Sequence, residues 1–402
     1  MNKRIFSWCL FDFANSSYSA VIAAVIFPVY YANVIVGNET GQGDLWWGRA
    51  ISLSMAIVAL TSPILGGFAD YSGLRKKLLG LYTFMCVAAV ASFSLLEKGM
   101  ALEGFLLMTF ANIGMEGGLV FYNSFLPMIA SPSVQGRVSA WGFGIGYAGS
   151  ILSLLLALLL IKQNMFNYVW PMVSVFFIIF ALPSFALLPA DERTQGAPAS
   201  SRILQTLKKI WTEKELRKFL FSYLIYEDGV NTVIVFSSIF AATTLKFSSE
   251  ELITLYLLVQ VTALSGAFAF AKTIDTAGPK KVVMLSLVLW TAVSFASAFV
   301  HQKPAFLIIA AVAGAGLGIV QAASRALYSS FIPEGHEAEY FGVYSLVGKS
   351  SAIAGPLVFG ILSSWFGSQR PAVLAIALFF ITGLLALSRV KTNKSPKTVM
   401  KP

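Results

Sequence analysis

The chain has 402 residues, of which 57% are hydrophobic and only 12% are charged, and its mean hydropathy is +0.74. A soluble domain carries about twice this charged fraction, so the composition excludes an ordinary soluble protein and indicates a helical membrane protein with many spans. The net charge of +10 does not point to nucleic acid, because membrane proteins collect Lys and Arg in their cytoplasmic loops.

The first apolar run, 8–31, follows a basic start without a small-residue cleavage site, so we expect a retained first helix and not a removed signal peptide. It carries Asp12, Asn15 and Ser16, whose i, i+3, i+4 spacing places them on one face of a helix. Charged side chains inside a span are costly, and these residues are therefore candidates for a substrate or proton site. The alternative is that they only hold helices together, or that Asp12 reaches the cytoplasmic headgroups.

Turn signals and charges divide the chain into twelve spans of about 20 residues, the length that crosses the hydrocarbon core. We predict an all-α polytopic membrane protein with two six-helix bundles, 1–188 and 218–390, joined by a cytoplasmic linker, 189–217, and followed by a basic cytoplasmic tail, 391–402. The predicted spans are 9–35, 46–69, 78–96, 102–126, 138–161, 166–188, 218–243, 251–271, 282–300, 304–331, 341–363 and 371–388.

The Lys and Arg residues predict the orientation. If both termini are cytoplasmic, the cytoplasmic segments hold 21 of these residues and the outer loops hold five. Since positive charge accumulates on the cytoplasmic side, we expect both termini and the linker there. The five outer residues are Lys98, Lys162, Lys246, Lys303 and Arg370.

Short motifs recur in the two halves at nearly one offset, which indicates an internal repeat. The loop GGFADYSGLRKK follows the second span and AKTIDTAGPKK follows the eighth; both contain D-x-x-G-x-[RK]-K, 205 residues apart. FLP at 125–127 recurs as FIP at 331–333, offset by 206. The opening stripe DFANS recurs as DGVNT, with Asp228 and Asn231, at an offset of 216, and Glu227 lies beside it. The longer first outer loop accounts for the difference.

With these motifs, the whole chain resembles the major facilitator superfamily, and the first loop motif resembles that superfamily's signature between its second and third helices. The stretches FDFANSSY, EGGLVFYNSFLP, GRVSAWGFGIGYAGS and YFGVYSLVGKSSAIAGP are similar to its autophagy-related, vacuole-effluxer-like branch. Fungal members of that branch are linked to amino-acid efflux from vacuoles. The resemblance implies that the first and seventh helices face each other across a central cavity, and that the protein lies in a bacterial cytoplasmic membrane.

The loop motif has a physical role that we can state in advance. We expect Asp70 to cap a helix N-terminus of the other half, and Arg75 and Lys76 to pair with acids or phospholipid heads, so that the motif closes the cytoplasmic gate. The alternative is a cluster that only sets topology. The predicted gating residues are Gly66, Asp70, Gly73, Arg75 and Lys76 in the first copy and Asp275, Gly278 and Lys280 in the second, where Ala271 replaces the leading Gly.

Other polar residues inside spans complete the candidate site. The acids Asp12, Glu116, Glu227 and Asp228 outnumber the two bases, so salt bridges such as Glu116–Arg325 are expected and at least one acid is expected to hold a proton. Such a carboxyl is a candidate proton carrier. The remaining candidates are Asn112, Glu116, Tyr122 and Asn123 in the fourth span, Gln321 and Arg325 in the tenth, and Lys349 in the eleventh.

Signatures of enzymes are lacking in the sequence. His301 and His336 are isolated, Cys9 and Cys86 lie in apolar segments, and the glycine-rich GFGIGYAG lies inside a span, where its glycines allow close helix packing. We therefore expect no catalytic residue, no metal and no cofactor.

The sequence thus predicts a secondary active transporter of a small polar solute, such as an amino acid, that is coupled to protons and works as a monomer in the lipid bilayer. Aromatic residues in the spans favour an alternative, an exporter of drugs or amphipathic metabolites. A third hypothesis, of another class, is a non-transporting receptor or scaffold on the same fold.

Overall fold

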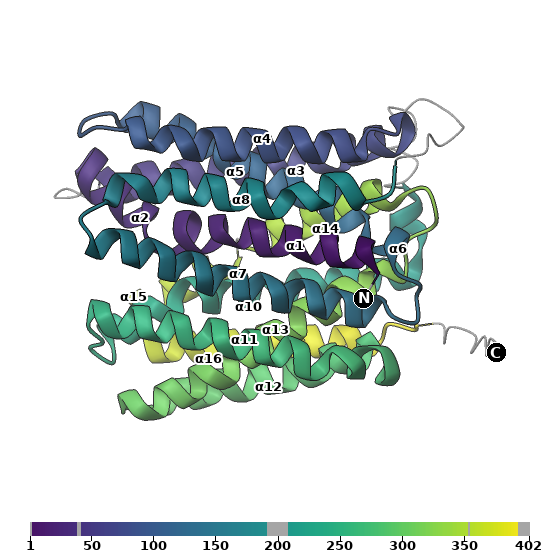
Figure 1. The fold of residues 1–402 in the computed structure, drawn as a ribbon. Helices are drawn as coiled ribbons and strands as arrows, with labels where there is room; N and C mark the ends of the chain where they lie inside the picture. The colour runs from purple at the N-terminus through teal and green to yellow at the C-terminus, as the bar shows by residue number, and fades with distance from the viewer. Residues whose placement is uncertain (1, 38–41, 191–207, 353, 393–402) are drawn as a thin grey trace.

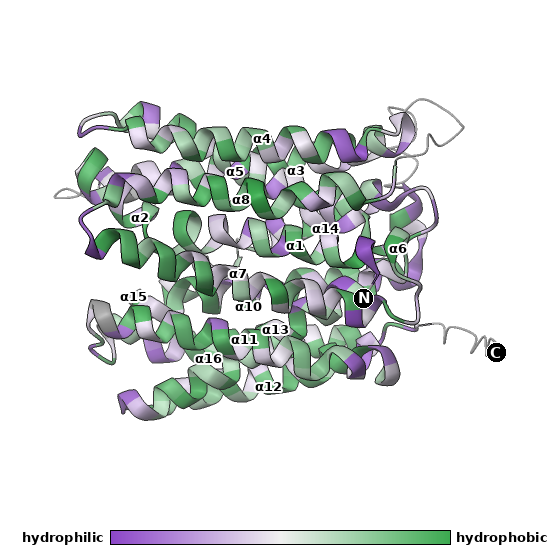
Figure 2. Cartoon of the chain, viewed as in Figure 1, coloured by the Kyte–Doolittle hydropathy of each residue, from purple (hydrophilic) through white to green (hydrophobic). Residues whose placement is uncertain are grey.

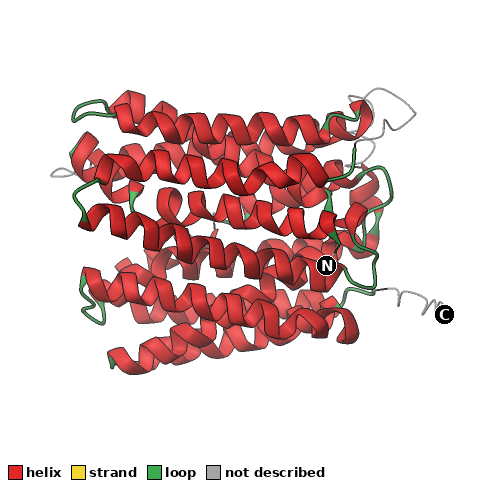
Figure 3. Cartoon of the chain, viewed as in Figure 1, coloured by secondary structure: helices red, strands yellow, loops and turns green. Residues whose placement is uncertain are grey.

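The computed structural model describes residues 2–37, 42–190, 208–352 and 354–392. Within these ranges every regular element is a helix, and the long helices run along a common axis with their connections at the two ends of the bundle (Figures 1 and 3). Most of the predicted linker, 191–207, and of the tail, 393–402, lies outside the described residues. We call the end where α1 begins and α16 ends the terminal end, and the opposite one the far end.

The long helices are built to face lipid. Ten of them are long and apolar enough to cross a membrane. Apolar residues cover their length, while hydrophilic residues gather near the two ends of the bundle (Figure 2). Large side chains such as Leu60 and Phe84 are each 71% exposed on this surface. The ten are α3 (Gln42–Ser72), α4 (Arg75–Ser92), α5 (Ala101–Ser124), α7 (Gln135–Lys162), α8 (Val169–Leu187), α10 (Lys214–Thr243), α11 (Ser249–Ala277), α12 (Pro279–Phe299), α13 (Lys303–Ser329) and α16 (Gln369–Ser388).

The first predicted span, 9–35, is bent by 40° between Lys3–Val25 and Phe27–Val36. Pro28 follows the bend; it lacks an N–H and its ring clashes with the preceding turn, which breaks a helix at such a position. Part of the span is π-helical, so that each backbone N–H there bonds to the carbonyl five residues earlier. Its segments are α1 (Lys3–Ser17), η1 (Tyr18–Val25), α2 (Phe27–Tyr30) and η2 (Tyr31–Val36).

The eleventh predicted span, 341–363, is interrupted in the structure. The structure divides it into α14 (Glu337–Ser350) and α15 (Ala354–Phe366), with a turn at 351–352. Pro356 explains the division, because a proline cannot donate to the carbonyl four residues earlier and so disfavours helix through the preceding turn. A pair of short helices therefore replaces the expected single span.

The buried apolar side chains form two clusters. One is drawn mostly from residues 8–188 and the other mostly from 210–390. Across the boundary between them, α3 packs against α14 and α7 packs against α11. The short elements that complete the chain are η3 (Phe93–Leu95), α6 (Leu126–Ile129) and η4 (Phe166–Tyr168).

Candidate functional site

A cavity of about 600 Å³ lies between the two halves, within the size range of small-molecule sites. Its lining comes from α1, η1, α5 and α7 on one side and from α10 to α13, α15 and α16 on the other. Along α13 the lining runs from Phe306, near the far end, to Arg325, near the terminal end. The cavity therefore extends from the far side of the bundle to a floor near Arg325.

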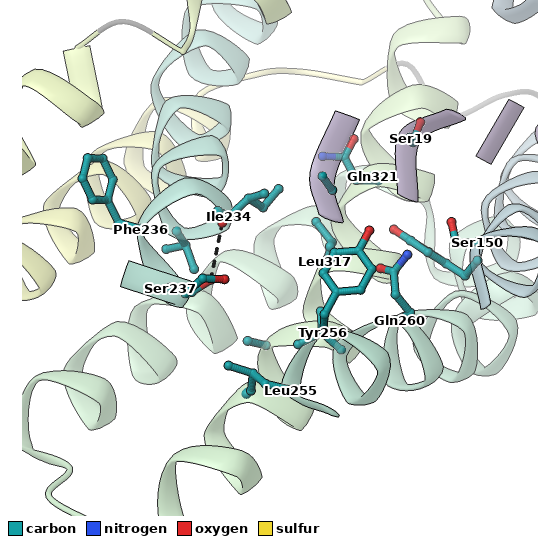
Figure 4. Close-up of a pocket in the computed structure, with 18 of the residues that line it drawn as sticks. Ser19, Ser150, Ile234, Phe236, Ser237, Leu255, Tyr256, Gln260, Leu317 and Gln321 are labelled. Atoms are coloured by element: carbon teal, nitrogen blue, oxygen red, sulfur yellow. Dashed lines mark hydrogen bonds between the residues drawn. The ribbon is translucent and has the colours of Figure 1, made fainter. Parts of the chain in front are cut away.

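The middle of the cavity is mainly apolar, with a few polar groups. Tyr256 and Gln260 from α11 and Gln321 from α13 point into a common space, and Ser19 and Ser150 lie on its other side (Figure 4). Sequence reasoning missed Tyr256 and Gln260. An amide at position 260 inside an apolar span was a signal that could have been used; nothing in the sequence marked Tyr256.

Arg325 forms the floor and is bound by the other half. Its side chain donates from Nε to Ser139 Oγ at 2.9 Å, from Nη2 to the Ser139 carbonyl at 2.7 Å, and from Nη1 to Asn123 Oδ1 at 3.1 Å. The guanidinium lies 4.7 Å from the ring centre of Trp8 and 4.0 Å from that of Phe143. Arg325 is only 3% exposed. A C-terminal-half cation is thus enclosed by N-terminal-half groups.

Asp12 is the counter-ion of Arg325, with Oδ2 3.6 Å from Nη1. Asn15 donates to Oδ1 at 3.4 Å, whereas among the described residues Oδ2 has no hydrogen-bond partner. The glycine-rich face of α7 permits this arrangement, because a Cβ at Gly142 would collide with Asp12 and Arg325. The close helix packing expected of that glycine-rich stretch is present.

A second ion pair crosses between the halves, from Glu116 on α5 to Lys349 on α14. The expected Glu116–Arg325 pair is therefore wrong. Arg325 bonds to Asn123, which lies seven residues beyond Glu116 on α5, or about 10 Å along the helix axis. Arg325 and Lys349 each pair with the acid that lies at the same height along the bundle axis, Asp12 and Glu116 respectively.

Asp228 does not line the cavity. Its Oδ1 accepts the N–H of Gly355 at 2.9 Å, at the start of α15, and Asn231 donates to Ser351 Oγ at 3.1 Å, beside the helix break. The stripe on α10 is thus used to hold α15. The expectation that the stripes of the first and seventh spans face each other across the cavity holds only for the first in this structure.

The structure brings some of the predicted site residues into the cavity wall and places others behind it. Asn112 receives a hydrogen bond from Tyr18 at 3.2 Å and donates to Ser54 at 2.7 Å, within one half. Tyr122 stacks on Trp8, with ring centres 4.7 Å apart. Cavity-lining residues are Asp12, Asn15, Ser16, Glu116, Asn123, Gln321 and Arg325; Asn112, Tyr122, Glu227, Asp228, Asn231 and Lys349 are not among them.

The first loop motif joins the halves at the terminal end. Asp70 accepts the N–H groups of Ala338 and Glu339 at 3.2 and 2.9 Å, which is the expected helix cap, here on α14. Arg75 pairs with Asp70 and with Glu337, the latter at 3.1 Å. The motif therefore holds the other half in two ways: Asp70 caps the N-terminus of α14, and Arg75 forms an ion pair with Glu337.

The second loop motif makes the matching contact. Asp275 accepts the N–H of Arg137 at 3.0 Å, at the start of α7, and its Oδ2 lies 3.4 Å from Arg137 Nε. Gly73 and Gly278 have φ of 65° and 90°, the left-handed region that glycine adopts readily. In both copies an aspartate thus caps a helix of the opposite half.

The lysines of the two motifs bond to the ends of helices. Lys76 donates to the carbonyl of Leu188 at 2.9 Å, and Lys280 donates to the carbonyl of Ser388 at 2.9 Å. Each bonds the C-terminal end of a helix in its own half, where the helix dipole favours a cation. The acid or phospholipid head expected as a partner of Lys76 stays a prediction.

Comparison with known proteins identifies a family and relatives for this chain. The family model described as "Vacuole effluxer Atg22 like" matches residues 49–399. An uncharacterized MFS-type transporter, YxiO of Bacillus subtilis (strain 168), is 29% identical over 98% of this chain and 96% of its own length. Autophagy-related protein 22 of Vanderwaltozyma polyspora is 23% identical over 91% of this chain and 78% of its own length.

Solved structures show the same fold. The major facilitator superfamily transporter FucP, in the outward conformation, has a TM-score of 0.78 at 14% identity and covers 97% of this chain and 100% of its own. The human organic anion transporter MFSD10 (TETRAN) has a TM-score of 0.78 at 14% identity and covers 96% of this chain and 98% of its own. At this identity the likeness shows the fold alone.

Proposed function

This chain belongs to the vacuole effluxer Atg22-like family and is a transporter of the major facilitator type, and we propose that it moves a small zwitterionic solute with an apolar part, such as an amino acid. Transport is by alternating access, in which the two halves rock about the cavity.

The observation that carries this proposal is the pair of opposite charges at the cavity floor, Asp12 from one half and Arg325 from the other. A zwitterion can offer an ammonium to Asp12, whose Oδ2 lacks a hydrogen-bond partner among the described residues, and a carboxylate to the guanidinium. Because the pair joins the halves, a solute that inserts between the two charges changes how strongly the halves are held together.

The walls above the floor favour an apolar part in the solute. Phe236, Trp290, Phe306 and Phe359 line the cavity, and aromatic walls gain free energy by covering apolar surface. The same walls support the second candidate, an exporter of amphipathic metabolites. The two candidate functions differ in the charge of the solute, because an amphipathic metabolite need not be a zwitterion.

We further propose that transport is coupled to protons, that both termini are cytoplasmic in a bacterial cytoplasmic membrane, and that the monomer is the working unit. The excess of buried acids over bases supports the first point, and the distribution of Lys and Arg supports the second. The cavity and both loop contacts are complete within one chain, which supports the third.

The test is uptake into proteoliposomes of a panel comprising zwitterionic amino acids, an organic anion and a sugar, with and without an imposed pH gradient. We expect uptake of a zwitterion driven by the gradient. Asp12→Asn removes a charged contact worth about 1.5–3 kcal/mol, so its apparent affinity should fall by about 10- to 100-fold. Glu103→Gln, at an exposed position on α5, is the matched control and should transport normally.

Each other outcome rejects the proposal in a specific way. Uptake of the organic anion alone would favour the exporter of amphipathic metabolites. Vesicles that take up no member of the panel, with or without the gradient, would favour the non-transporting receptor or scaffold.

A further inference from the structure

Glu227 is a buried acid without a cation of its own. It lies on α10 and is 6% exposed; its Oε1 accepts a hydrogen bond from Gln321 at 2.9 Å. Its Oε2 has no hydrogen-bond partner within the described part of the chain. The other core acids are occupied, because Asp12 and Glu116 have ion-pair partners and Asp228 caps α15. An unpaired buried carboxylate is costly, which favours the neutral form of Glu227 in this conformation.

Lys349 lies at the same level of the bundle as Glu227. Their helices, α14 and α10, pack together, and Tyr223 stacks on Tyr344 with ring centres 4.4 Å apart. Glu227 lies one helical turn beyond Tyr223 on α10. On α14, Gly348 lies one turn beyond Tyr344, and a Cβ added to it would be 3.1 Å from the Tyr223 hydroxyl. Lys349 is the next residue on α14.

Two carboxylates thus lie on helices that pack against α14, one in each half. Lys349 is paired with Glu116 across the boundary, and Glu227 is on its own half. We propose that Lys349 couples proton movement to the rocking of the halves by exchanging partners: Glu116 when the terminal end is closed, Glu227 when it is open. The proposal rests on the alternating-access transport proposed above and names its coupling group.

The exchange follows from the cost of an unpaired buried charge. Opening the terminal end moves α14 away from α3 and α5 and so removes Glu116 from Lys349. The ammonium then needs another carboxylate, and Glu227 Oε2 is available in its own half. To pair, Glu227 releases its proton to water at the terminal end. Once the terminal end has closed again and Lys349 has returned to Glu116, a proton from the far-side cavity beside Gln321 neutralises the unpaired Glu227.

One proton therefore crosses per cycle, from the far side to the terminal side, and no other bond changes. The remaining groups that face Glu227 are the Gln321 amide and tyrosine hydroxyls, which are uncharged near neutral pH. These tyrosines are Tyr223 and Tyr226 on α10, Tyr344 on α14 and Tyr147 on α7. Lys349 is the one cation that acts on Glu227 among the described residues.

The experiment measures the terminal end without any solute. Spin labels at Lys77→Cys and Lys281→Cys, both exposed and one in each half, report the distance across the terminal end in a background lacking Cys9 and Cys86. In the wild type, the open population should rise with pH, by at most about tenfold per pH unit for one linked proton. Glu227→Gln mimics the neutral acid and should stay closed at every pH. Glu116→Gln should shift the population towards open.

Controls make the result decisive. Glu103→Gln removes an exposed acid of the same type and should behave as the wild type. Glu227→Asp keeps a titratable group and should retain the pH dependence, which maintains the test if the Gln variant folds poorly. The proposal fails if Glu227→Gln keeps the wild-type pH dependence, or if Glu116→Gln remains as closed as the wild type. Because no solute is present, a failed uptake assay with normal pH-linked distances would reject the zwitterion and leave this coupling standing.

Discussion

The Asp228 carboxylate accepts the Gly355 N–H on the first turn of α15, inside a membrane span. Asp12 holds the matching place in the repeat, yet it binds Arg325. Ala148-Gly149 recurs in the second half as Ala354-Gly355, offset by 206. The two aspartates differ because α7 continues through Gly149, whereas the chain breaks just before Gly355 and exposes helix N–H groups there. Identical residues thus become an ion-pair partner in one half and a helix cap in the other.

This assignment of Asp228 predicts a stability difference between two variants. Asp228→Ala removes the cap and should lower the free energy of unfolding by about 1–2 kcal/mol, because no bulk water replaces the acceptor inside the membrane. Asp228→Asn keeps an acceptor oxygen and should lose less. Thermal unfolding of the purified variants in detergent measures both. Equal stability of Asp228→Ala and the wild type would contradict the cap.

At the scale of elements, closure of the terminal end depends on how near α3 comes to α14. Gly66 on α3 faces the backbone of Ala338 so closely that any Cβ would overlap it, and Gly342 on α14 faces the backbone of Ser62 in the same way. The glycines allow backbone contact, and the Asp70 cap then lies within hydrogen-bond distance of α14. The contact between α3 and α14 therefore depends both on close packing at the glycines and on the Asp70 cap.

Gly66→Ala should force these helices apart and favour the open terminal end. Its matched control is Gly48→Ala on the same helix, where an added Cβ meets nothing within 4 Å; there the better helix propensity of Ala adds about 1 kcal/mol. A cysteine at Ala140, an α7 residue buried against the C-terminal half, reports opening by its rate of maleimide labelling. We expect faster labelling with Gly66→Ala only. Equal rates in the two variants would show that the contact tolerates a methyl group.

For the whole molecule, apolar residues form a belt along the middle of the helices and hydrophilic residues gather near the two ends of the bundle (Figure 2). The belt carries exposed side chains such as Phe84 and Leu60, which suit lipid and not water. Lys77 and Lys281 are exposed at the terminal end, and Lys98 is exposed at the far end. The charge distribution along the chain therefore predicts which end faces the cytoplasm.

Labelling of intact cells with an impermeant thiol reagent tests this orientation. Lys98→Cys should react from outside, and Lys281→Cys should react only after the membrane is permeabilised, because positively charged ends are retained in the cytoplasm. An unlabelled variant without Cys9 and Cys86 is the background control. The reverse pattern would invert the proposed topology and, with it, the direction of the proton path through Glu227.

The sequence by itself determined the all-helical class, nearly all the span positions and the Asp70 cap. The thickness of the hydrocarbon core sets the length of a span. The repeated D-x-x-G-x-[RK]-K motif is contained in one short loop, so the capping role of its aspartate could be predicted from the sequence. The partners of the buried charges were decided only by the tertiary structure. Which acid meets Arg325 or Lys349 depends on which helices touch and at what height, and no residue spacing within one helix contains that information. The break before Gly355 follows from Pro356 in the sequence, but its capping by Asp228 depends on α10 lying beside it, which only the tertiary structure decides.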